Sequence, residues 1–361
     1  MKSPRSWKNL RIAVTGINAH AENPGPGLAV SRCLREHPDF EGAIIGLAYD
    51  ALDAGLYDRE NLDSAYLIPY PSAGEEALLE RIAAIHAEEQ FDVIIPCLDS
   101  ELQTFIRLKD DLESLGVTML IPSREQFNMR AKTHLVELCR SISVNVPRSK
   151  TLSDPSFFDR VEKEGFKYPL VVKGIFYDAS IVYNVFEAKA AFARLAAKWG
   201  YPCLVQEVIK GDELNLAAVG DGAGGLSGYV MMSKRALTDK GKAWAGVTVE
   251  DEEMLKVSTT LVKALKWRGP LEVEAMRGQD GKIYLIEINP RFPSWIYLSH
   301  AVGRNLPCAV LKILTGEEIT MPQHKTGTFF IRYARELTME LEDFEAVLIM
   351  GASGKRRLHT C

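Results

Sequence analysis

Four short apolar runs, separated by longer amphipathic stretches, constrain the fold of the first third of the chain. The runs cover residues 10–16, 42–48, 91–99 and 116–122, and the stretches between them favour helices at 26–36, 74–89 and 100–115. Apolar strands that alternate with helices are typical of a parallel sheet covered by helices. We therefore predict an α/β, Rossmann-like domain over residues 1–122. Ligands of such sheets bind beyond the carboxyl ends of the strands, which here are 15–18, Asp50 and 99–101.

The pattern changes after about residue 124. A helix at 126–141 precedes a strand within 144–152, strands at 168–174 and 201–211 flank a helix at 186–199, and hairpins at 213–237 and 269–291 flank a helix at 252–266. Antiparallel hairpins mixed with helices predict an α+β domain over residues 123–320, with a small lobe at about 147–206. Residues 321–361 are expected to add strands and turns that pack on this body.

Composition narrows the class of protein. The formal net charge of −5 argues against general nucleic-acid binding. The six cysteines are far apart and form no CxxC pair, which fits reduced thiols better than disulfides or a zinc site. No stretch approaches the roughly 18 apolar residues that a membrane span requires. We expect a cytoplasmic protein with no nucleic-acid or membrane partner.

The strongest chemical signal is residues 284–295, YLIEINPRFPSW. On a strand, Glu287, Asn289 and Arg291 would alternate and project from one face. The preceding strand carries Glu272 and Glu274 in the same alternation, so a hairpin would place carboxylates of both strands side by side. Solvated surface carboxylates would show the same alternation. Adjacent carboxylates that share a hard cation such as Mg²⁺ explain the whole motif better, because bound Mg²⁺ usually also contacts nucleotide phosphates and an arginine can bind a phosphate oxygen.

These motifs, with YPLVVKG, CLVQEVIKGDELN and GPLEVEAM, resemble the ATP-grasp superfamily over roughly residues 10–315, in the style of its carbamoyl-phosphate synthase and biotin carboxylase branch. The resemblance implies a Rossmann-like domain followed by an ATP-grasp domain with two lobes. It implies an ATP site made by Lys132, Lys173, Gln206, Glu207, Val208, Ile209 and Glu213. It also implies one or two Mg²⁺ ions on Glu274, Glu287 and Asn289, with Lys173 and Arg291 acting on the transferred phosphate.

Some of these roles have a simpler alternative. Lys132 falls on a helix face, where a solvated lysine is common, and Glu207 could face solvent while Glu213 holds the ribose. Lys173 ends an apolar strand, where an ammonium without a partner would be costly. The stretch after Lys173 has a single glycine where ATP-grasp proteins usually have a glycine-rich flap. Its polar tip includes Asp178, which could contact substrate or a further cation.

The acceptor site is expected near the basic loop 231–251 and the stretch 292–295. The candidate substrate residues are Lys234, Arg235, Lys242, Trp244 and Trp295, together with Asp99 and Glu101 at the edge of the first sheet. The loop could equally be solvated, and Glu101 could cap its helix instead of receiving an amine. In the resemblance, FPSW replaces an Arg/Ser-rich continuation of carbamoyl-phosphate synthases, which implies a bulkier, partly apolar carboxylate and not bicarbonate or carbamate.

The resemblance implies an ATP-dependent carboxylate–amine ligase that forms an acyl phosphate from an amino acid, a peptide or a similar metabolite, and it is compatible with a homodimer. A nucleotide-binding partner protein with little turnover is the main alternative, because the flap is short. A kinase that stops at phosphoryl transfer is also compatible with the sequence. A dinucleotide-dependent oxidoreductase is disfavoured, because residues 15–27 lack the G-x-G-x-x-G spacing.

Overall fold

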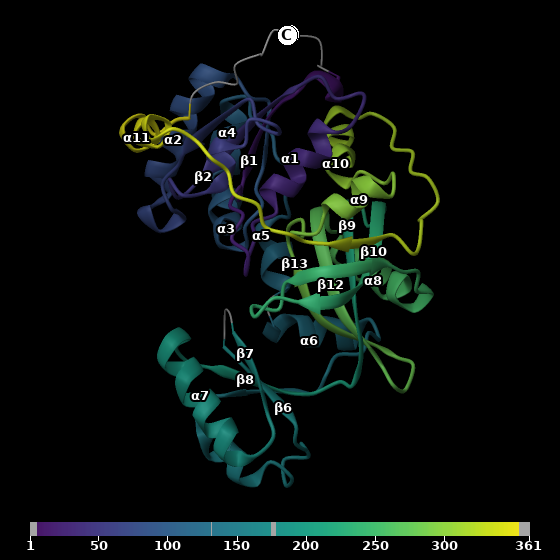
Figure 1. Cartoon of the computed structure of the whole chain (residues 1–361). Coiled ribbons are helices and arrows are strands. Elements are labelled where there is room, and N and C mark those ends of the chain that lie inside the picture. Colours follow the sequence, from purple (N-terminus) through teal and green to yellow (C-terminus); the bar gives the residue numbers. More distant parts are fainter. Residues whose placement is uncertain (1–5, 131, 175–177, 354–361) are drawn as a thin grey trace. The chain divides into compact units, whose positions relative to one another are not determined.

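The computed structural model describes residues 6–130, 132–174 and 178–353 (Figure 1). The chain divides into two compact units. The first consists of residues 1–138, 214–274 and 287–361, and the second of residues 139–213 and 275–286. The predicted small lobe lies within the second unit. In the described part of the chain, no helix combines the length and apolarity needed to cross a membrane.

The first unit begins with a four-stranded parallel sheet. Its strands, in the order β3-β2-β1-β4, are β1 (Arg11–Thr15), β2 (Ala43–Ala48), β3 (Ser64–Leu67) and β4 (Val93–Ile95). Ile12 and Val14 face one hydrophobic cluster and Ala13 faces the other, so both faces of the sheet are covered. This confirms the Rossmann-like prediction. The short strand β3 was not predicted, and the predicted strand at 116–122 is reduced to a single bridge between Thr118 and Val93.

Helices cover both faces of this sheet. They are α1 (Gly27–Arg35), α2 (Glu75–Glu89), α3 (Asp99–Arg107) and α4 (Lys109–Ser114), with 3-10 turns η1 (Trp7–Asn9), η2 (Ala54–Tyr57) and η3 (Pro71–Ala73). The helix predicted at 100–115 is divided in two, because Leu108 leaves helical geometry with φ −82° and ψ 3° and is buried in the core.

A six-stranded sheet forms the centre of the second half of the chain. In the order β13-β12-β9-β10-β11-β14, its strands are β9 (Gly211–Asp221), β10 (Leu226–Leu237), β11 (Ala243–Thr248), β12 (Arg268–Gly278), β13 (Ile283–Asn289) and β14 (Phe329–Ile331). The predicted hairpins are confirmed as β9–β10 and β12–β13. Gly222 and Gly224 have positive φ in the first turn, a conformation that glycine adopts without strain.

Further helices accompany this sheet. They are α5 (Arg124–Met129), α6 (Lys132–Ser141), α8 (Glu252–Leu265), α9 (Tyr297–Ala301), α10 (Leu306–Thr315) and α11 (Leu341–Met350). Asp251 caps α8 by accepting a hydrogen bond from the Met254 N–H at 2.9 Å. The single helix predicted at 126–141 corresponds to α5 and α6.

The C-terminal region corrects the expectation of strands and turns alone. Helix α11 has acidic residues in its first turn and a left-handed C-cap at Gly351, both of which favour a helix. It lies beside α2 in Figure 1, and Arg81 Nη2 donates to the Gly351 carbonyl at 2.7 Å. Ala352 then forms a bridge with Tyr66 at the outer strand of the first sheet.

The second unit has its own sheet and core. Its sheet has the order β5-β8-β6-β7, with strands β5 (Ser149–Leu152), β6 (Leu170–Lys173), β7 (Ala179–Val182) and β8 (Cys203–Glu207), next to η4 (Pro155–Arg160) and α7 (Val185–Trp199). Its core is rich in aromatic residues, including Phe157, Phe158 and Phe192. Strands β5, β6 and β8 and helix α7 match those predicted for this region, whereas β7 lies in the stretch after Lys173 that was expected to form a short flap.

Candidate active site

The hairpin β12–β13 carries a cluster of acidic side chains in the first unit. Glu272 is only 4% exposed. Its carboxylate accepts hydrogen bonds from Trp295 Nε1 at 2.7 Å, Asn289 Nδ2 at 3.1 Å and Arg291 Nη1 at 3.2 Å. A longer contact of 3.5 Å joins it to Asn215 Nδ2 on β9. The alternation in the sequence placed Glu272 and Glu274 on one face of the strand, but only Glu274 was predicted to be a site residue.

Glu274 lies two residues further along β12 on the same face. It accepts a hydrogen bond from Asn289 Nδ2 at 2.8 Å and forms an ion pair with Lys234 Nζ at 3.3 Å. The amide of Asn289 therefore lies between the two glutamates and donates to both. This contact confirms the predicted proximity of the two strands' polar residues, although the metal-binding roles of Glu274 and Asn289 remain predictions.

The two glutamates differ in electrostatic environment. Burial raises the pKa of Glu272, and the nearby charge of Glu274 raises it further. Burial also acts to raise the pKa of Glu274, but the ammonium groups of Lys234 and Lys242 outweigh it and lower that pKa. Glu274 is thus the more strongly ionised member of the pair.

Arg291 connects this cluster to the first sheet. Its Nε donates to Asp99 Oδ2 at 2.8 Å and its Nη1 contacts Glu272, and the side chain is almost wholly buried. Burial opposes the guanidinium charge, but Asp99 and Glu272 more than compensate and raise the pKa of Arg291. The residue predicted to bind phosphate is therefore held by two carboxylates.

The donor atoms on this hairpin suit a hard cation. Glu287 is half-buried on β13, two residues before Asn289, and adds a third carboxylate to those of β12. Within the described residues, no three acidic, histidine or cysteine side chains are already arranged as a complete metal site. Mg²⁺ is commonly held by only one or two carboxylates together with substrate phosphates, so this donor set fits it.

Arg332, which the sequence did not single out, lies at the border of the same region. It follows β14, and its Nε and Nη2 donate to the Ala243 carbonyl at 2.8 Å and to Ser294 Oγ at 2.9 Å. Both partners are neutral, and burial lowers the pKa of Arg332 to about 10. Ser294 immediately precedes Trp295, which bonds to Glu272, so Arg332 is attached to the segment that follows the acidic hairpin. The signal in the sequence that could have identified Arg332 was the alternation of side chains in FFIRY, residues 329–333.

The predicted acceptor residues occupy different environments. Lys234 is nearly buried, Lys242 and Trp244 are half-buried, and Arg235 is exposed on β10. Trp295 is buried, with its indole committed to Glu272, so it supports the cluster and does not form an open wall.

The turn between β10 and β11 is attached to the loop that follows β1. Thr238 Oγ1 donates to the Glu22 carbonyl at 2.9 Å, and the Asp239 N–H donates to Glu22 Oε2 at 2.8 Å. The basic loop is therefore held against the first sheet.

Glu101 belongs to a different, closed network. Its fully buried carboxylate accepts hydrogen bonds from the Thr15 and Tyr49 hydroxyls and from the Cys97 and Leu98 N–H groups, the last two at 2.8 Å. The contact with Leu98 is a helix cap, so the capping alternative holds and the prediction that Glu101 receives an amine is corrected. Asp99, in contrast, pairs with Arg291.

Four of the predicted nucleotide-binding positions lie on strands of the second unit. Lys173 ends β6 and is half-buried, and Glu213 lies near the start of β9. Gln206 is buried and donates to Ser149 Oγ at 2.9 Å. Glu207 accepts a hydrogen bond from the Arg148 N–H at 2.8 Å, so it is not simply solvated.

Val208 and Ile209 form the half-buried link from β8 to β9. Lys132 begins α6, but its side chain lies outside the described residues.

Asp178, a predicted substrate contact, is bound within its own unit. Its carboxylate accepts from Lys198 Nζ at 2.7 Å and from Trp199 Nε1 at 3.0 Å, both on α7. Its φ of 65° is left-handed, which suits a tight turn. These contacts attach the turn between β6 and β7 to α7, and residues 175–177 of that turn lie outside the described residues. Asp178 thus has a structural explanation that the sequence did not supply.

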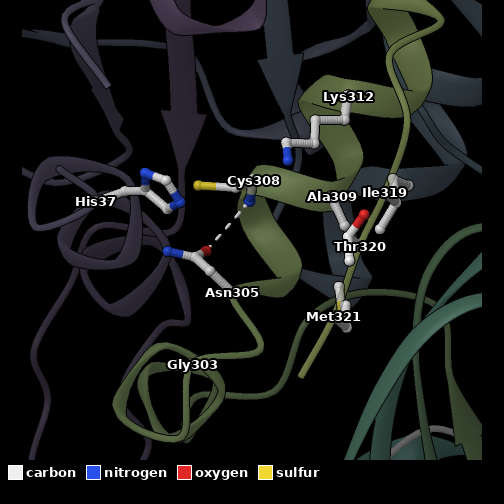
Figure 2. Close-up of a pocket in the computed structure, with 9 residues that line it drawn as sticks. All are labelled: His37, Gly303, Asn305, Cys308, Ala309, Lys312, Ile319, Thr320 and Met321. Atoms are coloured by element: carbon white, nitrogen blue, oxygen red, sulfur yellow. Dashed lines mark hydrogen bonds between the residues drawn. The ribbon is translucent and has the colours of Figure 1, made fainter. Parts of the chain in front are cut away.

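A small polar cavity of about 60 Å³ lies elsewhere in the first unit (Figure 2). His37, Asn305 and Lys312 contribute polar groups to it, and Asn305 Oδ1 accepts a hydrogen bond from the Cys308 N–H. This volume is sufficient for a few water molecules. None of the residues of the acidic cluster lines it, so it is separate from the candidate active site.

The parallel sheet, the six-stranded sheet with its acidic hairpin and the separate αβ unit together define the ATP-grasp fold. This is the fold that the motifs predicted. Residues 201–336 match the model of a family described as "ATP-grasp in the biosynthetic pathway with Ter operon".

Known proteins resemble the chain over larger parts of its length. The carbamoyl phosphate synthase large chain of Clostridium acetobutylicum is 25% identical over 235 residues, which are 60% of this chain and 22% of the relative. The chain thus spans less than a quarter of that relative.

Two solved structures share the fold. One is the biotin carboxylase domain of 2-oxoglutarate carboxylase from Hydrogenobacter thermophilus, in complex with MgADP, ADP and bicarbonate, with a TM-score of 0.66, 16% identity and coverage of 89% of this chain and 73% of the other. The other is the L-amino acid ligase of Bacillus licheniformis, with a TM-score of 0.62, 18% identity and coverage of 85% and 74%. Such low identities show the shared fold and no more.

Proposed function

We propose that the protein is an ATP-dependent carboxylate–amine ligase. The observation that carries the proposal is the buried cluster of Glu272, Glu274, Asn289 and Arg291 on one hairpin of an ATP-grasp fold. This cluster combines oxygen donors for a cation with a guanidinium suited to a phosphate. The names of the relatives, which include a carbamoyl phosphate synthase and an L-amino acid ligase, support the same chemistry.

The proposed reaction has two steps. A substrate carboxylate attacks the γ-phosphorus of ATP, which forms an acyl phosphate and releases ADP. An amine then attacks the acyl carbon, which forms the C–N bond and releases phosphate. Most of the rate in such a reaction comes from positioning and from stabilisation of charge.

Residues of the hairpin would hold Mg²⁺ and orient the phosphate. Glu287 and Asn289 would bind the ion together with phosphate oxygens. The carboxylate of Glu274 would add negative charge near the same ion. Bound Mg²⁺ would neutralise charge that develops on the phosphoryl group. Arg291 would donate to a phosphate oxygen in exchange for part of its present contact with Asp99 and Glu272.

Residues of the second unit would bind the nucleotide. Lys173 would contact the phosphates, the segment 206–209 would contact adenine through its backbone and apolar side chains, and Glu213 would accept from the ribose hydroxyls. Lys132 would supply a second ammonium. These assignments rest on the sequence motifs and on the placement of the motifs on strands of the ATP-grasp fold.

We assign the acceptor carboxylate to Arg332 and Lys242. A half-buried guanidinium bonded only to neutral oxygens in the described residues is electrostatically suited to an anionic ligand. Lys242 adds a second positive charge in the same region, as its effect on Glu274 shows. This arrangement favours an acid such as an amino acid or a peptide carboxylate.

A nucleotide-binding partner protein with little turnover is the second candidate. The short turn after Lys173 favours it, because Asp178 attaches that turn to α7. The acidic cluster argues against it, since a buried set of carboxylates and cations is costly to keep without a catalytic use.

The test is ADP release by the purified protein with ATP and Mg²⁺, across pooled carboxylates with and without pooled amines. Hydroxylamine in a parallel series would trap an acyl phosphate as a hydroxamate, without need of the natural amine. Mass spectrometry of active pools would identify a condensed product. Hydroxamate or a condensed product would establish the ligase. ATP binding without ADP from any pool would favour the second candidate, and a phosphorylated product that resists hydroxylamine would indicate a kinase.

A further inference from the structure

The contact between Lys234 and Glu274 is unusual for a residue predicted to bind a metal. Lys234 is on β10 and Glu274 on β12, and β9 lies between these strands in the sheet. The lysine side chain reaches across β9 to place Nζ 3.3 Å from Glu274 Oε2. The two side chains are only 9% and 16% exposed. An ammonium already lies where a divalent cation would have to approach that carboxylate.

Each carboxylate of β12 thus has its own cation. Glu272 is paired with Arg291 at 3.2 Å, and Glu274 with Lys234. Separating the buried pair of Lys234 and Glu274 is costly, so a divalent ion would replace the ammonium only where its own binding compensates for that loss. Lys242 also acts on Glu274 and would repel a second cation there.

The orientation of Asn289 leads to the same conclusion. Its amide nitrogen donates to Glu272 and Glu274, at 3.1 and 2.8 Å. Because the nitrogen and oxygen of an amide point in different directions, the Asn289 oxygen is turned away from the β12 carboxylates. The oxygen that a metal would need is therefore not the group of Asn289 that faces Glu274.

We propose that Lys234 replaces a divalent cation at Glu274, so that the site takes a single Mg²⁺, held by Glu287 and Asn289 with the nucleotide phosphates. The inference rests on the proposed function, because it assumes that a nucleotide binds. It selects one ion over two. It also assigns Lys234 the role of neutralising charge at the metal site in place of contacting substrate.

The experiment counts bound Mn²⁺ by electron paramagnetic resonance, in the presence of the full-length protein and a saturating non-hydrolysable ATP analogue. One Mn²⁺ per ternary complex is expected, since the nucleotide brings one ion with it. In Lys234→Met, a second Mn²⁺ is expected to bind at least about tenfold more tightly than in the wild type. Lys234→Arg, which keeps the charge, should again bind one.

Lys256→Met is the matched control, because Lys256 is 74% exposed on α8. Circular dichroism and denaturant titration establish that each variant is folded, and Lys234→Gln serves if the methionine variant is not. Two tightly bound ions in the wild type would overturn the inference alone. So would an unchanged ion count and affinity in a folded Lys234→Met. Calorimetry that detects no binding of the ATP analogue would overturn the proposed function together with the inference.

Discussion

Two sets of carboxylates in the first unit, Glu101 on α3 and the pair of Glu272 and Glu274 on β12, are satisfied in opposite ways. Glu101, at the end of the parallel sheet, accepts hydrogen bonds from two hydroxyls and two backbone N–H groups. Glu272 and Glu274, on the antiparallel sheet, depend on Arg291, Lys234 and the Asn289 amide. Neutral donors satisfy the carboxylate of Glu101, whereas Glu272 and Glu274 are paired mainly with charged groups.

This difference distinguishes the carboxylate of Glu101, which has a structural role, from the carboxylates that we propose to be functional. Neutral donors fixed in the backbone cannot be exchanged without unfolding the turn that carries them. Ion pairs can be exchanged for a metal ion or a phosphate, provided that the incoming charge compensates for the loss. A search for active sites from burial alone would have selected Glu101, and only the identity of its partners distinguishes it from Glu272.

The largest expected effect is on the rate of ADP formation and comes from the proposed metal site. Glu287→Gln should lower the rate of ADP formation by about a thousandfold, because the amide cannot supply the charge that holds the cation. The measurement is steady-state ADP release with the active substrate pool. Glu253→Gln on α8 is the control and should leave the rate unchanged. Turnover within threefold of the wild type in a folded Glu287→Gln would remove Glu287 from the metal site.

The next effect concerns the stability of the charged cluster. Arg291→Leu should lower the free energy of unfolding by about 3 kcal/mol, because Asp99 and Glu272 would stay buried without their cation. Denaturant titration measures this change. Arg235→Leu, on an exposed position of β10, should cost less than about 0.5 kcal/mol. A loss below 1 kcal/mol for Arg291→Leu would mean that these carboxylates are solvated in the folded protein.

The hydrogen-bond network around Glu101 should lose less stability on mutation than the charged cluster does. Glu101→Ala is expected to cost about 2 kcal/mol, since it leaves buried hydroxyl and N–H donors without an acceptor. The same titration applies. Glu101→Gln provides the matched comparison, because its oxygen can keep the two N–H contacts and its amide nitrogen can donate to the Tyr49 hydroxyl. Equal losses in the alanine and glutamine variants would show that charge, and not hydrogen bonding, holds this network.

The smallest effect is a dependence on pH. Burial raises the pKa of Glu101 above its ordinary value of 4.5. The folded protein therefore binds this proton more tightly than the unfolded chain, and the resulting stabilisation is complete below pH 4.5 and is lost as the pH rises through the folded pKa. Glu101→Gln should gain stability relative to the wild type over that interval, by at most about 1.4 kcal/mol per pH unit. A constant difference between the two proteins across the interval would contradict the raised pKa.

The sequence predicted the elements of the fold better than their boundaries. Strong periodicity identified α2, α7 and α8 and both hairpins, because each buries one regular face. Strand β3 was missed because four residues give little periodicity, and α11 was missed because its apolar run resembles a strand. The break at Leu108 depends on tertiary packing, which local periodicity does not reveal.

The site was predicted only in part, for a similar reason. Alternation placed Glu287, Asn289 and Arg291 on one strand and Glu272 and Glu274 on another. The sequence could not give the register between the strands, and so it could not show that the Asn289 amide lies between the two glutamates. Arg332 and the pairing of Lys234 across β9 depend on contacts between distant segments. Such contacts become visible only in three dimensions.

The bridge between Tyr66 and Ala352 has a consequence for synthesis of the protein. The outer strand of the first sheet obtains this neighbour only when the last part of the chain has left the ribosome. At about 5–20 residues per second, that strand edge stays uncovered for some tens of seconds after Tyr66 has been made. An uncovered strand edge invites pairing with other chains. The nascent protein is therefore expected to need protection from aggregation, for example by a chaperone, while residues 67–352 are being made.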